Sequence, residues 1–131
     1  MVMKFKDKQA LALIIIIVLF AFAVRWETVR QPRDFWIDES FQYEMSQKPI
    51  SFILNSPDVH PPLFNLFTKT LLELGFESPL TLRLIMVFLS LIFIVVLFYA
   101  VKEMFNLDVA FYSSLLISFS LTYIYYSTEF R

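Results

Sequence analysis

The sequence predicts an all-α membrane protein with about three transmembrane helices and amphipathic interfacial helices in its first extracytoplasmic loop. The first supporting observation is composition: 58% of the 131 residues are hydrophobic, which leaves too little polar surface to cover a small soluble globule. The second is the presence of long apolar stretches almost without charge. The third is the position of the six prolines, which all lie between the first and second of these stretches.

Composition also excludes several classes of protein. A net charge of −1 argues against a nucleic-acid binder that works through a broad basic surface. The absence of cysteine excludes disulfides, thiolate zinc sites and thiol nucleophiles. A single glycine excludes a phosphate-binding P-loop, and the high hydrophobicity excludes intrinsic disorder.

Three nearly uncharged windows are expected to cross the membrane, at residues 10–26, 84–101 and 109–126. Each is close to the roughly 17 to 25 residues that a membrane-spanning helix needs. The first window has a second interpretation, because Lys4, Lys6 and Lys8 precede it and Ala21-Phe22-Ala23 fits a signal-peptidase site. The later windows, and Trp26 at a membrane interface, favour a retained helix.

The basic N-terminus predicts the orientation, because positive residues stay in the cytoplasm. The expected order is a cytoplasmic tail, a span, a long extracytoplasmic loop, a span, a cytoplasmic turn, a span and the start of a second extracytoplasmic loop. Their bounds are 1–9, 10–26, 27–83, 84–101, 102–108, 109–126 and 127–131.

Two interfacial helices are expected in the long loop, near residues 38–48 and 62–74. Pro62 and Gly75 suit the start and the end of the second helix. At about 1.5 Å per residue this helix would be roughly 20 Å long, too short to cross a core of about 30 Å. If it did cross, residues 127–131 would lie in the cytoplasm instead.

The adjacent carboxylates Asp38 and Glu39 are candidates for a general base or a metal ligand at the membrane surface. The alternative is structural, with Asp38 capping the following helix and Glu39 favouring its positive end. His60, the one histidine, precedes two prolines that fix its direction, so it could contact an anion, bind a metal or shuttle a proton. It could equally be an ordinary loop residue.

The chain ends with Glu129 and Arg131, two residues apart. They could form an interfacial ion pair beside an aromatic belt, or a second acidic site with Arg131 as an anion clamp. Arg83, just before the second span, is expected to mark the lipid headgroup boundary.

In combination, these features resemble the N-terminal part of GT-C type membrane glycosyltransferases. The closest groups are the protein O-mannosyltransferase, aminoarabinose transferase and lipopolysaccharide-core glycosyltransferase families. The resemblance covers nearly the whole chain and lies in the order of its motifs. These are a lysine-flanked first helix, FWIDES, DVHPPLFNLF, LGFESPLTLRL, a span, a short turn and LTYIYYSTEFR.

The resemblance implies an enzyme that moves a sugar from a polyprenyl-phosphate-linked donor to an extracytoplasmic protein or glycolipid hydroxyl. It places Asp38 as the catalytic base with Glu39 as its partner, and His60, Glu129 and Arg131 at the donor phosphate or the acceptor. It assigns no cofactor, leaves a divalent metal open and involves no nucleic acid. It also implies a mannosyltransferase-like, multi-pass protein of a prokaryotic plasma membrane, of which these residues are an N-terminal fragment without activity of its own.

A different class of protein also fits the residues. In this alternative the chain is a small three-span accessory or structural membrane protein, its acidic loop is a docking surface, and Asp38 is only a helix cap.

Overall fold

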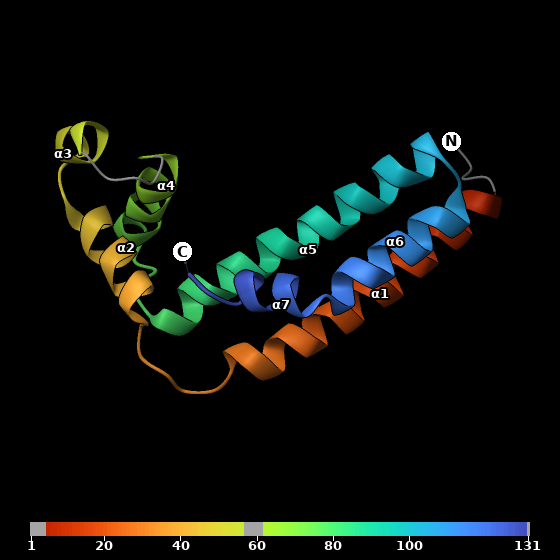
Figure 1. The fold of residues 1–131 in the computed structure, drawn as a ribbon, viewed down its shortest axis with the longest axis horizontal. Helices are drawn as coiled ribbons and strands as arrows, with labels where there is room; N and C mark the ends of the chain where they lie inside the picture. Colours follow the sequence, from red (N-terminus) through yellow and green to blue (C-terminus); the bar gives the residue numbers. More distant parts are fainter. Residues whose placement is uncertain (1–4, 57–61, 131) are drawn as a thin grey trace.

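The computed structural model describes residues 5–56 and 62–130, which form seven helices and, within these ranges, no strand. The predicted all-α fold class is therefore confirmed. Two long helices and a broken third form an elongated bundle, and three short helices gather at one end of it (Figure 1). The helices are α1 (Phe5–Val29), α2 (Ile37–Gln47), α3 (Ile50–Asn55), α4 (Pro62–Glu73), α5 (Pro79–Met104), α6 (Leu107–Phe119) and α7 (Leu121–Ser127).

The bundle is formed by α1, α5 and α6, which contact one another along their lengths (Figure 1). Small residues at the contacts, including Ala10, Ala21 and Ala110, let the helix backbones approach closely. Larger aliphatic and aromatic side chains fill the rest of the core. They are Ile14, Ile17, Val29, Val87, Leu91, Ile94 and Phe98.

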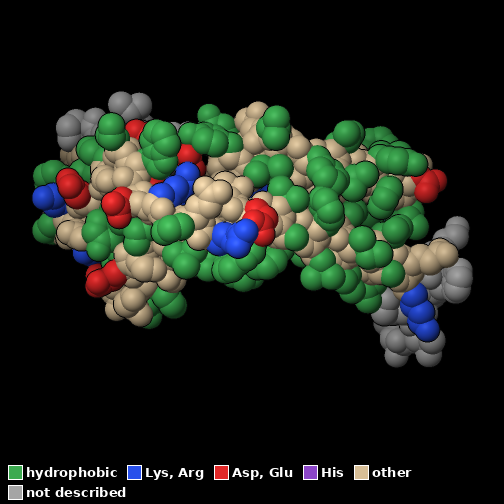
Figure 2. All heavy atoms as spheres, turned by 90° about the horizontal axis from the view of Figure 1, so that it is seen from below, with side chains coloured by type: hydrophobic (Ala, Val, Ile, Leu, Met, Phe, Trp, Pro, Cys, Tyr) green, Lys and Arg blue, Asp and Glu red, His purple; other side chains and the backbone are tan. Residues whose placement is uncertain are grey.

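Two helical segments, Lys8–Val29 and Pro79–Met104, are long and apolar enough to cross a membrane. The pair α6 and α7 makes a third candidate span if the two helices are taken together. Large apolar side chains on the bundle surface are exposed, and Figure 2 shows them covering most of its length, with charged side chains gathered mainly at the end that carries α2 and α4. An apolar exterior of this kind suits lipid rather than water.

The window expected as one helix at residues 109–126 is broken at Ser120, where α6 and α7 meet at 64°. The hydroxyl of Ser120 accepts a hydrogen bond from the Tyr123 N–H at 3.4 Å and so caps the new helix. The guanidinium of Arg25 donates to the Ser118 carbonyl at the end of α6 at 3.4 Å. Both ends created by the break therefore have hydrogen-bond partners.

The short helices are defined by their termini. The structure begins α2 at Ile37, one residue before the expected start, so Trp36 rather than Asp38 is the N-cap. Helix α4 ends in a Schellman motif, because the Phe76 N–H bonds to the Leu71 carbonyl at 3.0 Å and the Gly75 N–H to the Leu72 carbonyl at 2.9 Å. The φ of +88° at Gly75 explains the glycine there. Helix α3 was not predicted.

Helices α2 and α4 pack against each other and bury polar as well as apolar residues. Gln42 and Ser46 of α2 are buried, as are Asn65 and Thr68 of α4, together with the apolar residues Met45 and Leu71. Other apolar side chains of the same helices are exposed, with Ile37 at 85% and Leu63 at 76%. Exposed apolar side chains of this kind suit a lipid-facing environment.

Candidate functional site

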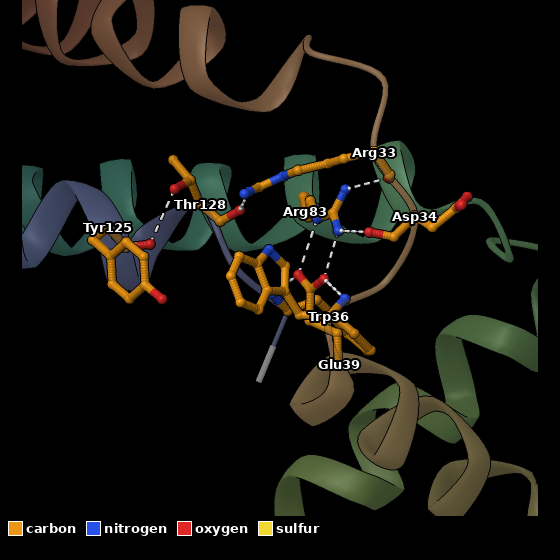
Figure 3. A network of polar contacts seen from close by, with 8 residues as sticks. Arg33, Asp34, Trp36, Glu39, Arg83, Tyr125 and Thr128 are labelled. Carbon is orange, nitrogen blue, oxygen red and sulfur yellow. Dashed lines mark hydrogen bonds and ion pairs between the residues drawn. The ribbon is translucent and has the colours of Figure 1, made fainter.

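Glu39 is the centre of a polar network where the short helices meet the bundle (Figure 3). It is the third residue of α2 and is fully buried. Its carboxylate accepts four hydrogen bonds, two from the Arg83 side chain and one each from the backbone N–H groups of Trp36, at 3.0 Å, and Phe130, at 2.8 Å. One side chain thus links α2, α5 and the C-terminal segment.

Arg83 supplies the charge opposite Glu39. It lies in the first turns of α5, is 1% exposed, and donates from Nε to Oε1 at 2.9 Å and from Nη2 to Oε2 at 2.5 Å. Its Nη1 and Nη2 also donate to the carbonyls of Arg33 and Asp34, at 3.0 and 2.8 Å. The guanidinium therefore holds the loop between α1 and α2 as well as the carboxylate. The expectation that Arg83 marks the headgroup boundary stays a prediction.

The environment lowers the pKa of Glu39. Burial alone would raise the pKa of this carboxyl, because it disfavours the charged form. The hydrogen bonds from Arg83, Phe130 and Trp36 and the positive charge of Arg83 outweigh burial and keep its pKa below the ordinary value of 4.5. Glu39 is consequently ionised at neutral pH, and its burial and its four hydrogen bonds, rather than its charge, make it unsuited to accept a proton from a substrate.

The C-terminal segment reaches Glu39 through aromatic packing. Phe130 is fully buried, with its ring 5.5 Å from that of Phe64 and 6.3 Å from that of Phe35. Its neighbour Glu129 is 3% exposed. The segment of the second candidate acidic site therefore packs directly against the segment of the first, 91 residues earlier in the chain.

Asp38 differs from Glu39 in its surroundings. It is exposed in the first turn of α2, one residue before the buried carboxylate. The network fixes the backbone on which Asp38 stands, because the neighbouring residue is held by four hydrogen bonds. Of the two adjacent carboxylates, one is committed to structure and one is open to solvent.

A second buried arginine, Arg25 near the end of α1, contacts the ends of α6 and α7. Its Nε donates to the Ser127 hydroxyl at 2.9 Å, and its Nη1 donates to the Ala21 carbonyl at 3.0 Å. Its guanidinium also lies 5.2 Å from the centre of the Tyr123 ring. Arg25 thereby ties α1 to both sides of the break between α6 and α7.

A cavity of about 460 Å³ opens beside the network, between the loop after α1 and the start of α5. Three arginines line it, Arg30, Arg33 and Arg83, together with one acidic residue, Asp34. The Nε of Arg33 is buried and has no hydrogen-bond partner among the described residues, and its Nη2 donates to the Thr128 carbonyl at 3.5 Å. This cluster of cations was not anticipated from the sequence.

Of the predicted site residues, Asp38 and Glu39 lie in the first turn of α2, and Glu129 lies in the segment that the Phe130 N–H ties to Glu39. His60 and Arg131 lie outside the described residues. Sequence reasoning missed the structural roles of Arg83 and Arg25. The signal for both was a lone arginine at the edge of an apolar stretch, a pattern that headgroup anchoring produces equally well.

Residues 5–56 and 62–130 contain no group of three or more acidic, histidine or cysteine side chains that could hold a metal ion. The polar groups that the described part of the chain gathers at the site are carboxylates, arginines and backbone amides.

The fold and the site together define an integral membrane protein with a polar site at one end of its helical bundle. The chain belongs to the dolichyl-phosphate-mannose-protein mannosyltransferase family, whose profile matches residues 59–131. The resemblance to GT-C type membrane glycosyltransferases is thereby confirmed. Comparison with curated proteins and with solved structures gives no match.

Proposed function

We propose that this chain forms the donor-side part of a glycosyltransferase that moves a sugar from a polyprenyl-phosphate-linked donor to a hydroxyl group on the extracytoplasmic side of the membrane. The observation that carries this proposal is the division of roles between two adjacent carboxylates. Glu39 is buried and held by Arg83, whereas Asp38 is exposed on the same helical turn. A rigid support beside an accessible carboxylate is what a general base needs.

The proposed reaction uses Asp38 as the base. Its carboxylate takes the proton of the acceptor hydroxyl while the acceptor oxygen forms a bond to the anomeric carbon of the sugar. The bond between that carbon and the phosphate oxygen breaks, and the lipid phosphate leaves with the electron pair. The developing negative charge on the phosphate requires cations nearby, which arginine side chains can supply.

The location of the site agrees with a lipid-linked donor. Glu39 and Arg83 lie where α5 begins, at the end of a candidate membrane span. A donor anchored by a polyprenyl chain carries its phosphate at that level, so the sugar need not leave the membrane surface to react. Exposed apolar residues on α2 and α4, such as Ile37 and Leu63, support a position along that surface.

The orientation can be tested by cysteine labelling, because the parent chain contains no cysteine. Lys48 is exposed at the end of α2, on the side proposed to be extracytoplasmic. In intact cells, a membrane-impermeant maleimide should label Lys48→Cys without permeabilisation. Labelling that requires permeabilisation would place the site in the cytoplasm and overturn the proposed topology.

The activity is tested by sugar transfer from a polyprenyl-phosphate donor in membranes that carry the intact protein. Asp38→Asn should lower the rate by about 10²- to 10⁴-fold, the usual contribution of a general base. Glu44→Gln is the matched control, because it neutralises another exposed acid on α2 and should transfer sugar at the parental rate. Parental transfer by Asp38→Asn would remove Asp38 from the proposed role. If the intact parent protein transfers no sugar from such donors, the accessory-protein alternative is favoured.

A further inference from the structure

The arginine-lined cavity has features of an anion-binding site that neither the Glu39 network nor the proposed base uses. It encloses about 460 Å³ between the loop that follows α1 and the first turn of α5. Arginine forms paired, charge-assisted hydrogen bonds to phosphate more readily than any other side chain does. A ligand can bind only to those of the three arginines whose N–H groups are not already engaged.

Arg83 is not available, because its Nε, Nη1 and Nη2 are all engaged with Glu39 and with backbone carbonyls. Arg83 lines the cavity, but its charge is neutralised by Glu39. Arg33 is different. Its Nε is buried and has no hydrogen-bond partner among residues 5–56 and 62–130, and its Nη2 makes a long hydrogen bond of 3.5 Å to the Thr128 carbonyl. A buried donor without a partner costs free energy that a ligand would recover.

Arg30 is the second available cation. Its Nε donates to Glu27 at 2.8 Å, but both side chains are more than half exposed, at 56% and 63%. Exposed pairs of this kind contribute little to stability, so Arg30 can exchange Glu27 for a better anion. The one acid that lines the cavity, Asp34, is exposed, and Figure 3 shows its carboxylate directed away from Arg83.

The position of the cavity relative to the candidate spans indicates which kind of ligand can reach it. The lining includes Val29, the last residue of the first candidate span, and Pro79, the first residue of the second. The cavity therefore opens at the level where these two spans leave the membrane. Apolar side chains such as Leu80 lie beside the arginines. A ligand with an anionic head and an apolar tail matches both parts of this lining.

We infer that this cavity binds a phosphate group carried by a membrane lipid, with Arg33 and Arg30 as the binding cations. The phosphate can come from the polyprenyl-phosphate donor or from a phospholipid of the surrounding bilayer. Phosphate binding at this cavity does not require Asp38 to be a base, because Asp38 is not among its lining residues. It is therefore independent of the proposed reaction.

The test measures lipid retention by the intact protein in neutral detergent, using native mass spectrometry. The probes are a polyprenyl monophosphate, a phosphatidic acid, a phosphatidylglycerol and, without a lipid tail, inorganic phosphate. Arg33→Gln should weaken retention of the lipid phosphates by about tenfold, the loss expected for one charge-assisted hydrogen bond. Arg30→Gln should weaken it by several-fold, roughly the effect of a more exposed cation.

Two further variants separate binding from folding. Asp34→Asn removes the one acid of the lining and should strengthen retention, a gain that a folding defect cannot produce. Lys48→Gln removes an exposed cation away from the cavity and should leave retention unchanged. Parental retention by both arginine variants, or an equal loss in Lys48→Gln, would overturn the inference.

The four probes also identify the source of the phosphate. Retention of the polyprenyl monophosphate at lower concentrations than phosphatidic acid and phosphatidylglycerol identifies the donor, whereas equal retention of all three lipids identifies the bulk membrane. Retention of inorganic phosphate as strong as that of the lipids would contradict a site built for a membrane ligand. Asp38→Asn should retain lipid normally while losing sugar transfer, so the failure of one proposal is distinguishable from the failure of the other.

Discussion

The guanidinium of Arg83 holds the carboxylate of Glu39 through two parallel hydrogen bonds, of 2.9 and 2.5 Å, with both side chains almost completely excluded from solvent. This pair joins residues 44 positions apart and links the start of α2 to the start of α5. The remaining acceptor capacity of Glu39 is used by backbone amides of Trp36 and Phe130. A buried pair satisfied to this extent can stabilise the fold, because its desolvation is offset.

Breaking the pair from either side should destabilise the protein strongly. Glu39→Gln and Arg83→Gln each leave one buried charge without its counter-ion, and each should lower the free energy of unfolding by about 3–5 kcal/mol. The double variant should lose less than the sum of the two, with a coupling energy of up to about 3 kcal/mol. Thermal unfolding in detergent, followed by tryptophan fluorescence, measures all three. Additive losses would show that the two side chains do not interact.

The lowered pKa of Glu39 predicts a dependence of stability on acid. Because the folded state lowers this pKa from the ordinary value of 4.5, the ionised carboxylate contributes stability that is fully present above that value. The contribution is lost as the pH falls through the lower, folded-state pKa. Unfolding temperatures measured from pH 7 down to pH 3 should therefore fall more steeply for the parent than for Glu39→Gln. Parallel profiles would exclude Glu39 as the titrating group.

Arg25 should control the position of the C-terminal segment. In the parent, Thr128 is 1% exposed, and Arg25 holds the adjacent Ser127. Thr128→Cys should consequently react slowly with a maleimide, and adding Arg25→Leu should accelerate the reaction roughly tenfold, as loss of one charge-assisted hydrogen bond implies. Leu74→Cys, at a position 67% exposed, should react quickly with or without Arg25. An unchanged rate at position 128 would mean that other contacts hold the segment.

Helices α2 and α4 offer a paired comparison of two buried hydroxyls. In the part of the chain that the structure describes, Thr68 Oγ1 has no hydrogen-bond partner, whereas Ser46 Oγ donates to the Gln42 carbonyl at 2.7 Å. Removing the first hydroxyl with Thr68→Val should leave stability unchanged or raise it by about 1 kcal/mol. Removing the second with Ser46→Ala should lower it by about 1 kcal/mol. A loss for Thr68→Val as large as that for Ser46→Ala would indicate a bridging water at Thr68.

The sequence was most informative where structure follows local pattern. Long uncharged stretches predicted the helical bundle because only composition and length decide whether a helix suits a membrane. Pro62 and Gly75 predicted the limits of α4 because their backbone preferences are local. The family resemblance could likewise be identified from motifs in order along the chain.

The contacts of the site could not be predicted in this way, because their partners are distant in sequence. Arg25 bonds to Ser127, 102 residues later, and Arg83 to Glu39, 44 residues earlier. Each arginine alone looks like a headgroup anchor. The break at Ser120 was also not predicted, because the apolar window is uninterrupted in the sequence. One hydrogen bond at the bend comes from Arg25 of another helix, which donates to the Ser118 carbonyl. Nor does the pattern of α4 reveal that Asn65 and Thr68 are buried together with Leu71.

We propose that Glu39 supports the site while Asp38 acts as the base. Thermal stability and sugar transfer, measured on the same preparations of Asp38→Asn and Glu39→Gln, separate the two roles. We expect Asp38→Asn to keep the parental unfolding temperature and lose transfer, and Glu39→Gln to lose stability as well as transfer. A stable Glu39→Gln variant, or an Asp38→Asn variant that transfers sugar at the parental rate, would contradict this proposal.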